Sequence, residues 1–378
     1  MSCKDDLGAI IDQFLPSLMH KRGLTGHQLK VLGALSACRT TKLGGSALIC
    51  GDCGSVHYVL HSCRNRHCPR CQGIEKELWI ENRKQELLPV KYYHVVFTVP
   101  HDLLELFRFN RKVMYNLLFE KLWETLCIFA KDPKLLGARP GAISVLHTWD
   151  QQLGFHPHVH MIVPPGGIDK QGRWKSTKQQ GYFLFDLKQL STVFSARFAS
   201  KLRRLKRKGK IKKHVPRDLI KEPWVVYAKQ AFGSPESVVE YLGRYSHRVA
   251  ISNHRILKVT DTHVTFSWLN RKAGHRKETA TLPGVEFLER FLEHIVPPHF
   301  RRIRHLGFLS NRNKREAIEK IREQLLAAHD IRTRLSRAQV LALHFGERSV
   351  LRCRECGGEL LLLESFPKER APPANRCA

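Results

Sequence analysis

The stretch FHPHVHMIV (residues 155–163) places histidines at every second position. Successive side chains of a β-strand point to opposite faces of the sheet, so His158 and His160 would project side by side from one face. The other face would carry hydrophobic core residues, namely Val159, Met161 and Val163. The pattern therefore predicts a strand with one buried face and one polar face suited to chemistry.

The preceding segment, AISVLHTW (142–149), also alternates and is joined to the histidine stretch by DQQLGF. Two such runs separated by a short polar segment predict an antiparallel hairpin. With a turn centred near residues 152–153, His147 would lie opposite His158 on the same face. His147, His158 and His160 would then offer three nitrogens to a divalent metal ion and leave positions open for phosphate oxygens. Weaker alternatives for the third ligand are Asp150, Gln151 and His156.

The rest of the chain mixes strand-like and helical patterns. Strands joined by hairpins and interleaved with helices predict an α+β fold with a mainly antiparallel sheet flanked by helices. Four regions are expected: a cysteine-rich region at 1–90, a central domain at 91–295, a basic helical region at 296–345, and a tail with a Cys-x-x-Cys motif at 346–378.

The composition points to a polyanionic partner. The 378 residues include 64 Lys and Arg against 34 Asp and Glu, a formal net charge of +30. A surplus of this size favours nucleic acid or an acidic membrane surface. The N-terminal stretch MSCKDDLGAIIDQFLPSLMHKRG does not resemble a secretory signal, and no apolar run approaches the roughly 20 residues of a membrane helix. We therefore expect a cytoplasmic protein that acts on nucleic acid, with no membrane partner.

The cysteines of the first region have the spacing of a zinc site. Cys50-x2-Cys53 is followed after fourteen residues by Cys68-x2-Cys71. Two such pairs can place four thiolates around one tetrahedral Zn²⁺, which predicts a structural zinc site. Other side chains nearby could replace a ligand, build a second site or be ordinary structural residues: Cys63 and His67 first, then His27, Cys38, His57 and His61.

The segment VVEYLGRYSHR (238–248) predicts a helix that carries a candidate nucleophile. Tyr241 and Tyr245, four residues apart, would share one helix face. A phenol can attack a phosphodiester that a metal ion polarises, which would give a phosphotyrosine link. Arg244 and Arg248 are placed to contact phosphates. The alternative is that both tyrosines are core residues of an amphipathic helix.

A basic run, KLRRLKRKGKIKKH (201–214), contains nine Lys and Arg within residues 201–213. It could guide single-stranded DNA through a basic groove, or it could be a solvated helix end. The residues we assign to DNA contact here are Lys201, Arg203, Arg204, Lys206, Arg207 and Lys208.

Taken together, HPHVHMIVPPGG, SCRNRHCPRCQG, YLGRYSHRVAIS and FRRIRHLGFLSNR resemble the rolling-circle transposases of the insertion sequence 91 type. ACRTTKLGG and VLHTWDQQL extend the resemblance, which spans roughly residues 25–325 and runs out in the tail. This family belongs to the HUH endonuclease superfamily, in which two histidines flanking a hydrophobic residue bind the metal, here His158 and His160.

The resemblance implies a fold and a reaction. It implies an antiparallel sheet with the histidines on a central strand, faced by the tyrosine helix, and a Mg²⁺ or Mn²⁺ ion. The enzyme would nick single-stranded DNA at the element's ends, form a 5′-phosphotyrosine intermediate and transfer the strand to target DNA. One tyrosine or both would act. The amino-terminal zinc-binding domain, at about residues 20–90, would recognise the terminal sequences.

Two other classes of protein share some of these features. A histidine-triad nucleotide hydrolase would use His158 as nucleophile, but it leaves the charge, the cysteine pairs and the tyrosine helix unexplained. A non-catalytic, zinc-dependent DNA-binding protein explains the charge and the cysteines but not the histidine strand. The tail adds Cys353, Cys356 and Cys377, an incomplete ligand set whose role the sequence leaves open.

Overall fold

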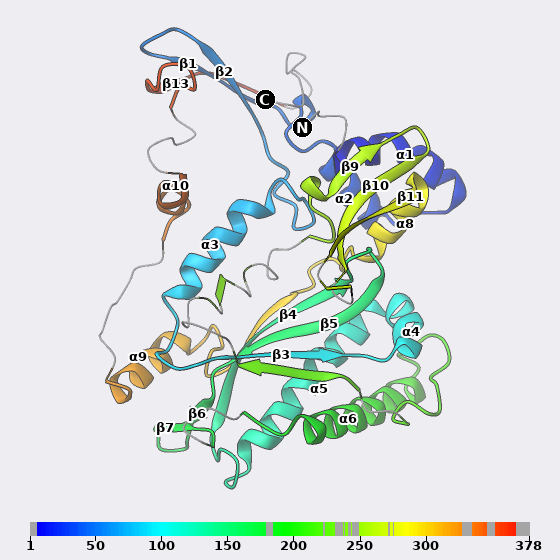
Figure 1. The fold of residues 1–378 in the computed structure, drawn as a ribbon, viewed down its shortest axis with the longest axis vertical. Coiled ribbons are helices and arrows are strands. Elements are labelled where there is room, and N and C mark those ends of the chain that lie inside the picture. The colour runs from blue at the N-terminus through cyan, green and yellow to red at the C-terminus, as the bar shows by residue number, and fades with distance from the viewer. Residues whose placement is uncertain are drawn as a thin grey trace.

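The computed structural model describes residues 6–178, 184–221, 224–230, 237, 239–240, 243, 249–270, 273–274, 276–326, 335–345 and 352–367. This part of the chain forms three antiparallel sheets with helices packed on them (Figure 1). The predicted α+β class, with an antiparallel sheet flanked by helices, is confirmed.

The largest sheet has seven strands and holds the histidine strand near its middle. β5 (Phe155–Val163) lies between β4 (Arg139–Trp149) and β3 (Tyr93–Thr98). The outer strands are β7 (Trp174–Ser176), β6 (Gly166–Ile168), β8 (Val226–Gln230) and β12 (Ile303–Gly307). β4 and β5 pair antiparallel, which confirms the predicted hairpin.

One face of this sheet is covered by two long helices, α5 (Arg111–Lys131) and α6 (Leu187–Arg207). The core side chains of β5 point to this face and are at most 1% exposed: Val159, Met161 and Val163. They share one hydrophobic cluster with aromatic residues of both helices. A short α4 (Leu104–Phe109) precedes α5, and the backbone leaves the helical conformation at Asn110 between them.

The opposite face of the same sheet is divided between apolar residues and histidines. Ile143, Val145 and Ile162 are buried against Phe308 and α9 (Lys314–Gln324). The histidines of β4 and β5 lie on this face nearer the hairpin turn, because they alternate with the residues of the α5–α6 core. The sheet therefore separates its main core from its polar face.

A second hydrophobic core joins the N-terminal region to the central domain. α1 (Leu7–Lys21) and α2 (Gly26–Ser36) share this core with α8 (Gly284–Glu293). The three-stranded sheet beside them consists of β9 (Ile256–Val259), β10 (His263–Asn270) and β11 (Arg276–Pro283). Segments that the sequence assigned to different regions, 1–90 and 91–295, are thus packed around one core.

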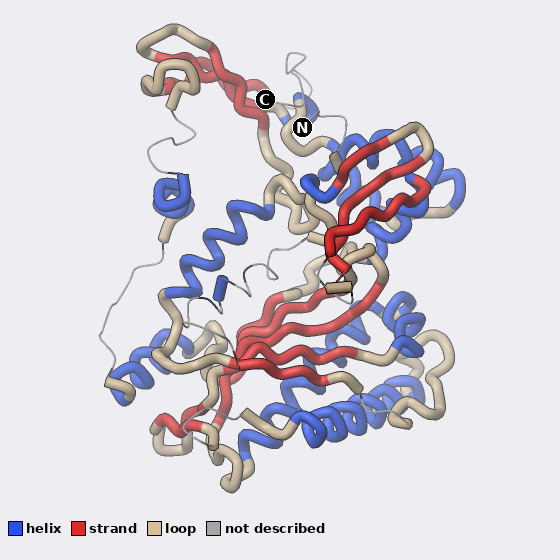
Figure 2. The backbone as a smooth tube through the Cα atoms, viewed as in Figure 1, coloured by secondary structure: helices blue, strands red, loops and turns tan. Residues whose placement is uncertain are grey.

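The third sheet brings distant parts of the chain side by side. Its strand order is β13 (Leu360–Phe366), β1 (Gly45–Cys50), β2 (Val56–Leu60). Its strands are drawn in red at the upper left of Figure 2. The tail expected at 346–378 therefore supplies an edge strand to a sheet of the first region. Ahead of the tail in the sequence, α10 (Arg337–Phe345) also contacts the first region. It lies against α3 (Gln72–Lys84), and Arg337 forms an ion pair with Glu75 at 2.9 Å.

The region 296–345 was expected to be helical, and this is corrected at its start. Residues 303–307 form β12, which pairs antiparallel with β4 so that Ile303 lies opposite Val145. Backbone groups on the free edge of β4 need hydrogen-bond partners, and this segment supplies them. The described residues also form short 3₁₀ helices at Thr41–Leu43, His101–Leu103 and Asn253–Arg255.

We expect Gly307→Ala to destabilise the pairing of β12 with β4. Gly307 has φ +62°, and an added Cβ would collide with the carbonyl oxygen of Pro140. Left-handed backbone alone costs a non-glycine residue roughly 1–2 kcal/mol, and overpacking adds about 1–3 kcal/mol. Gly172→Ala is the matched control, because Gly172 has φ +79° with nothing within 4 Å of an added Cβ. Urea unfolding should show the larger loss for Gly307→Ala, and equal losses would contradict the steric argument.

Candidate metal centre and cysteine clusters

Three histidines from two neighbouring strands converge on the polar face of the large sheet. His147 of β4 pairs directly with His158 of β5, and His160 follows two residues later. One nitrogen from each of the three lies within 4.8 Å of the others. The ring centroids are 5.4 Å apart for His147–His158, 4.6 Å for His147–His160 and 4.8 Å for His158–His160. The structure therefore brings together the three residues that the sequence selected.

Hydrogen bonds orient two of these rings. His158 Nδ1 lies 2.6 Å from the backbone carbonyl oxygen of His156, so Nδ1 carries the proton and donates a hydrogen bond to that oxygen. That tautomer leaves Nε2 of His158 available as a metal ligand. On the other side, His160 Nδ1 lies 2.8 Å from Nε2 of His94, a residue of β3. The second nitrogen of each ring is therefore held by a neighbour, as is usual for metal-binding histidines.

The surroundings favour the neutral imidazoles that metals bind. His147 and His160 are buried at 2% and 7% exposure. Burial lowers the pKa of His158 to about 4, and burial likewise lowers the pKa of His94 to about 4. Three neutral nitrogens at this spacing fit a divalent ion with positions left for other ligands.

His94 is the one member of this arrangement that sequence reasoning did not select. The signal was present, since His94 occupies the polar side of the alternating stretch at 92–100. What the sequence did not reveal is the pairing of β3 with β5, which puts His94 opposite Ile162 and beside His160. The ring of His94 stacks on that of His160 with centroids 5.0 Å apart.

The candidate nucleophiles and two candidate phosphate contacts, Tyr241, Tyr245, Arg244 and Arg248, lie outside the described residues. Gly243, between the two tyrosines in the sequence, is helical and buried. It packs so closely on Ile80 of α3 that any Cβ there would collide with that side chain. Glu240 pairs with Lys84 at 2.8 Å, so Glu240 and Gly243 both lie against α3.

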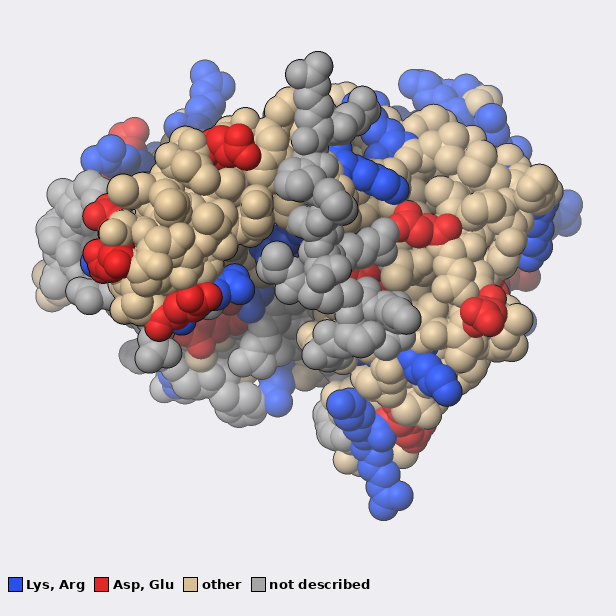
Figure 3. All heavy atoms as spheres, turned by 90° about the horizontal axis from the view of Figure 1, so that it is seen from above, with Lys and Arg blue, Asp and Glu red and all other residues tan. Residues whose placement is uncertain are grey.

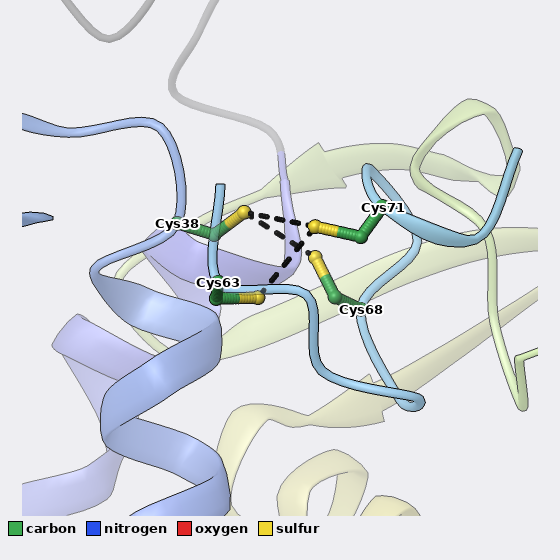
Figure 4. Close-up of side chains that lie close together, drawn as sticks. All are labelled: Cys38, Cys63, Cys68 and Cys71. Carbon is green, nitrogen blue, oxygen red and sulfur yellow. Dashed lines mark hydrogen bonds between the residues drawn. The ribbon is translucent and has the colours of Figure 1, made fainter. Parts of the chain in front are cut away.

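The first four-cysteine cluster consists of Cys38, Cys63, Cys68 and Cys71 (Figure 4). Its sulfur atoms are 3.6 Å apart for Cys38–Cys71, 3.5 Å for Cys38–Cys68 and 3.7 Å for Cys63–Cys71. Four sulfurs bound tetrahedrally to zinc at about 2.3 Å would lie roughly 3.8 Å apart. The cluster therefore has the size of a zinc site. Cys63 takes part in it, whereas His67 is not among the grouped ligand atoms.

The prediction of one site built from Cys50, Cys53, Cys68 and Cys71 is corrected by this arrangement. The structure groups Cys50 and Cys53 with Cys353 and Cys356 of the tail in a second cluster. The cause is the pairing of β13 with β1, which places the tail beside Cys50. Cys38 and Cys63, which the sequence treated as optional extras, take the places of Cys50 and Cys53 beside Cys68 and Cys71.

The basic run at the end of α6 is exposed, but it lies on the helical side of the large sheet, away from the histidine face. Lys201 pairs with Glu120 at 3.2 Å, and Lys206 donates to the backbone carbonyl of Lys213 at 2.7 Å. Figure 3 shows Lys and Arg side chains projecting from several places around the face it draws. Among the described helices, none has the length and apolar character that crossing a membrane requires.

The chain is similar to known transposases over nearly its whole length. A family model described as "Transposase zinc-binding domain" matches residues 10–99, and one described as "Putative transposase" matches residues 141–317. "Putative transposase y4qJ" of Sinorhizobium fredii (strain NBRC 101917 / NGR234) is 38% identical, over 94% of this chain and 93% of its own. The "Transposase for insertion sequence element IS801" of Pseudomonas savastanoi pv. phaseolicola is 30% identical, over 91% of this chain and 85% of its own. No solved structure matches.

Proposed function

Because this chain belongs to the insertion sequence 91 type family of transposases, we propose that it nicks and rejoins single-stranded DNA at the ends of its element. Membership of the family makes DNA transposition its function and DNA its partner, and gives it a zinc-binding domain. The proposal concerns the chemistry: a metal-dependent transesterification of the HUH endonuclease type, in the bacterial cytosol on nucleoid DNA.

The convergence of His147, His158 and His160 is the observation that carries this proposal. A Mg²⁺ or Mn²⁺ ion held there would polarise a phosphodiester and offset the charge that develops on its oxygens. The three rings would bind the ion, and His94 would hold the ring of His160 in its orientation. The apolar residues beside the histidines, Val145 and Ile162, would limit the access of water to the scissile phosphate.

We assign the nucleophile to Tyr241, Tyr245 or both. The phenol, with an unperturbed pKa of about 10, loses its proton and attacks the phosphorus atom. The new bond joins the tyrosine oxygen to the 5′ phosphate, and the bond from phosphorus to the 3′ oxygen breaks. That oxygen takes up a proton and leaves as a free 3′-hydroxyl. The phosphotyrosine conserves the phosphodiester bond for the later attack of a 3′-hydroxyl, which rejoins the strand and releases the tyrosine.

Basic side chains would supply the DNA contacts of this reaction. Arg244 and Arg248, close to the tyrosines in sequence, are assigned to the phosphates beside the scissile bond. The exposed run at 201–208 is assigned to sequence-independent attraction, which weakens as salt rises. The zinc-binding region is assigned to recognition of the element's ends.

A non-catalytic DNA-binding protein remains the alternative function. It would use the zinc-binding region and the positive charge without cleavage. A histidine-triad hydrolase does not agree with the family of this chain, and the three histidines it would need differ from those that converge, since His147 is on another strand. Cleavage therefore separates the two functions that are left.

Replacing His158 with alanine should lower the rate of strand nicking by about 100-fold or more, because a side chain that binds the metal matters at least as much as the residues that orient it. DNA affinity should stay near that of the wild type. His156→Ala is the matched control: it belongs to the same motif, lies outside the convergent set, and keeps the carbonyl that His158 contacts. The measurement is nicking of a labelled single-stranded element end with Mg²⁺ or Mn²⁺ on a denaturing gel. Unimpaired nicking by His158→Ala would refute the metal centre.

Replacing Tyr241 and Tyr245 together with phenylalanine should abolish the covalent protein–DNA adduct, since phenylalanine has no oxygen to attack. The two single variants decide how many tyrosines act, because one of them alone removes the adduct in a one-tyrosine reaction. Tyr227→Phe on β8, exposed at 47%, is the control and should form the adduct normally. An adduct that persists in the double variant would refute the nucleophile. Tight binding with no adduct in any form would favour the non-catalytic alternative.

A further inference from the structure

We propose that the chain binds a second structural zinc ion, held by Cys50 and Cys53 of the N-terminal region and by Cys353 and Cys356 of the tail. One sulfur from each lies within 4.8 Å of the others. Across the two halves, the sulfurs of Cys50 and Cys356 are 3.4 Å apart and those of Cys53 and Cys353 are 3.6 Å apart. These separations approach the roughly 3.8 Å expected around a tetrahedral zinc ion.

The two halves of this site repeat the same local structure although 300 residues separate them. In the first half, the N–H of Gly54 donates to the carbonyl of Cys50 at 3.0 Å, and Gly54 has φ +70°. In the second, the N–H of Gly357 donates to the carbonyl of Cys353 at 3.0 Å, and Gly357 has φ +79°. A Cys-x2-Cys-Gly turn on each side is the arrangement of a zinc ribbon, whose two turns face each other across the ion.

Polar groups around the sulfurs support a bound ion. His57 Nε2 lies 3.3 Å from the sulfur of Cys353, and the backbone N–H of Gly358 donates to the sulfur of Cys356 at 3.4 Å. The hydroxyl of Ser55 lies 3.1 Å from the sulfur of Cys53 and donates to Glu355 at 2.6 Å. An N–H donor such as that of Gly358 orients a metal-binding thiolate and stabilises its negative charge, whereas Ser55, whose one proton goes to Glu355, links the two halves of the site.

Hydrophobic burial holds the tail only weakly, because β13 buries Leu360 and Phe366 at its two ends and exposes the residues between them. The apolar cluster at this end of the molecule contains two leucines, Leu48 and Leu360, besides Cys50 and Cys353. The leucines in the middle of β13 are exposed instead: Leu361 at 53%, Leu362 at 64% and Leu363 at 56%. A core this small does not hold a strand by itself, whereas a zinc site contributes its binding free energy to folding. The ion would therefore anchor the tail to β1.

Zinc content of the full chain tests this proposal. The His158→Ala background removes the histidine centre as a competing zinc site, and we expect two zinc ions per chain by elemental analysis after dialysis against a weak chelator. Cys353→Ser with Cys356→Ser should leave one. Cys63→Ser with Cys71→Ser should also leave one, by emptying the first cluster. Cys127→Ser is the control, because Cys127 lies in α5 and belongs to neither cluster.

Conservative replacement separates loss of a ligand from loss of folding. Cys356→His supplies a nitrogen ligand at the same place and should keep two ions, with the cobalt-substituted protein retaining its thiolate absorption. A single ion in the parent protein, or two ions in the tail double variant, would overturn the proposal. Loss of both ions from the tail variant would overturn the separation into two sites.

A different observation points to a binding surface beside these sites. A cavity of about 820 Å³ is lined by residues of β2, the first cysteine cluster, α10 and the tail. Four arginines line it, Arg39, Arg64, Arg337 and Arg354, and one of them, Arg337, pairs with Glu75 at 2.9 Å. Tyr58, exposed at 45%, adds an aromatic ring to the lining.

Two of these arginines have a left-handed backbone conformation, which is unfavourable for residues other than glycine. Arg39 and Arg64 have φ +52° and φ +50°, and each directly follows a cysteine of the first cluster. A left-handed backbone is unfavourable for residues that carry a Cβ atom, so the cysteine cluster holds Arg39 and Arg64 in place. Nearby arginines have other roles, since Arg66 donates to the carbonyl of Phe300 at 2.6 Å and Arg70 pairs with Asp6.

We infer that this cavity binds the phosphates of a DNA strand, with Tyr58 available to stack on a base. The inference rests on the proposed function for its partner, and it places the contact with DNA between the two cysteine clusters. Arginine suits this task because its planar guanidinium can make paired hydrogen bonds to phosphate oxygens.

The test measures DNA binding without added Mg²⁺ or Mn²⁺, so it does not depend on cleavage. The probe is a fluorescein-labelled single-stranded element end, and its anisotropy is followed over a range of salt concentrations. Arg39→Ala with Arg354→Ala should weaken binding and reduce the salt slope by about 1.4, since each phosphate contact contributes about 0.7 for single strands. Arg173→Ala with Arg315→Ala, at sites exposed by 68% and 82%, is the matched control. An unchanged salt slope would overturn the proposal that this cavity binds phosphates. Normal DNA binding without nicking by the wild-type protein would count against the nuclease function alone.

Discussion

The hydrogen-bond register between β4 and β5 is the constraint on which the histidine centre depends. It sets His147 opposite His158 and so brings a third ring to the pair on β5. A slip of one residue would turn every side chain of a strand to the other face and scatter the set. The turn fixes the register: the carboxylate of Asp150 accepts the N–H groups of Gln152 at 2.8 Å and Gly154 at 2.7 Å. His294 adds a hydrogen bond from its Nε2 to the carbonyl of Leu153 at 3.1 Å.

The same strands serve stability on one face and chemistry on the other. Val159 and Met161 are completely buried against the helices, which holds β5 in the middle of the sheet. Burial on the opposite face lowers the pKa of His158 to about 4, so its ring is neutral near pH 7 and can donate its electron pair. Desolvation that would be unfavourable for a charged histidine thus favours the form that a metal requires.

Sequence reasoning succeeded where the relevant pattern is local. Alternation is read within a few residues, so the strand at 155–163 and its hairpin could be predicted, together with His147. β12 could not, because it becomes a strand by completing the free edge of β4, about 160 residues away. The cysteine grouping failed for a related reason. Cys-x2-Cys pairs look alike in sequence, and only the pairing of β13 with β1 decides which pair meets Cys50 and Cys53.

α3 explains how a zinc-binding region could influence a reaction on the large sheet. The helix starts directly after Cys71, a member of the first cluster, and runs to Lys84. A helix of 13 residues spans roughly 20 Å at 1.5 Å per residue. Near its end, Ile80 packs on Gly243 and Lys84 pairs with Glu240, within the segment that carries the candidate tyrosines. α3 therefore connects the first cysteine cluster to Glu240 and Gly243, so DNA bound at that cluster, as proposed above, would have a defined position relative to these two residues.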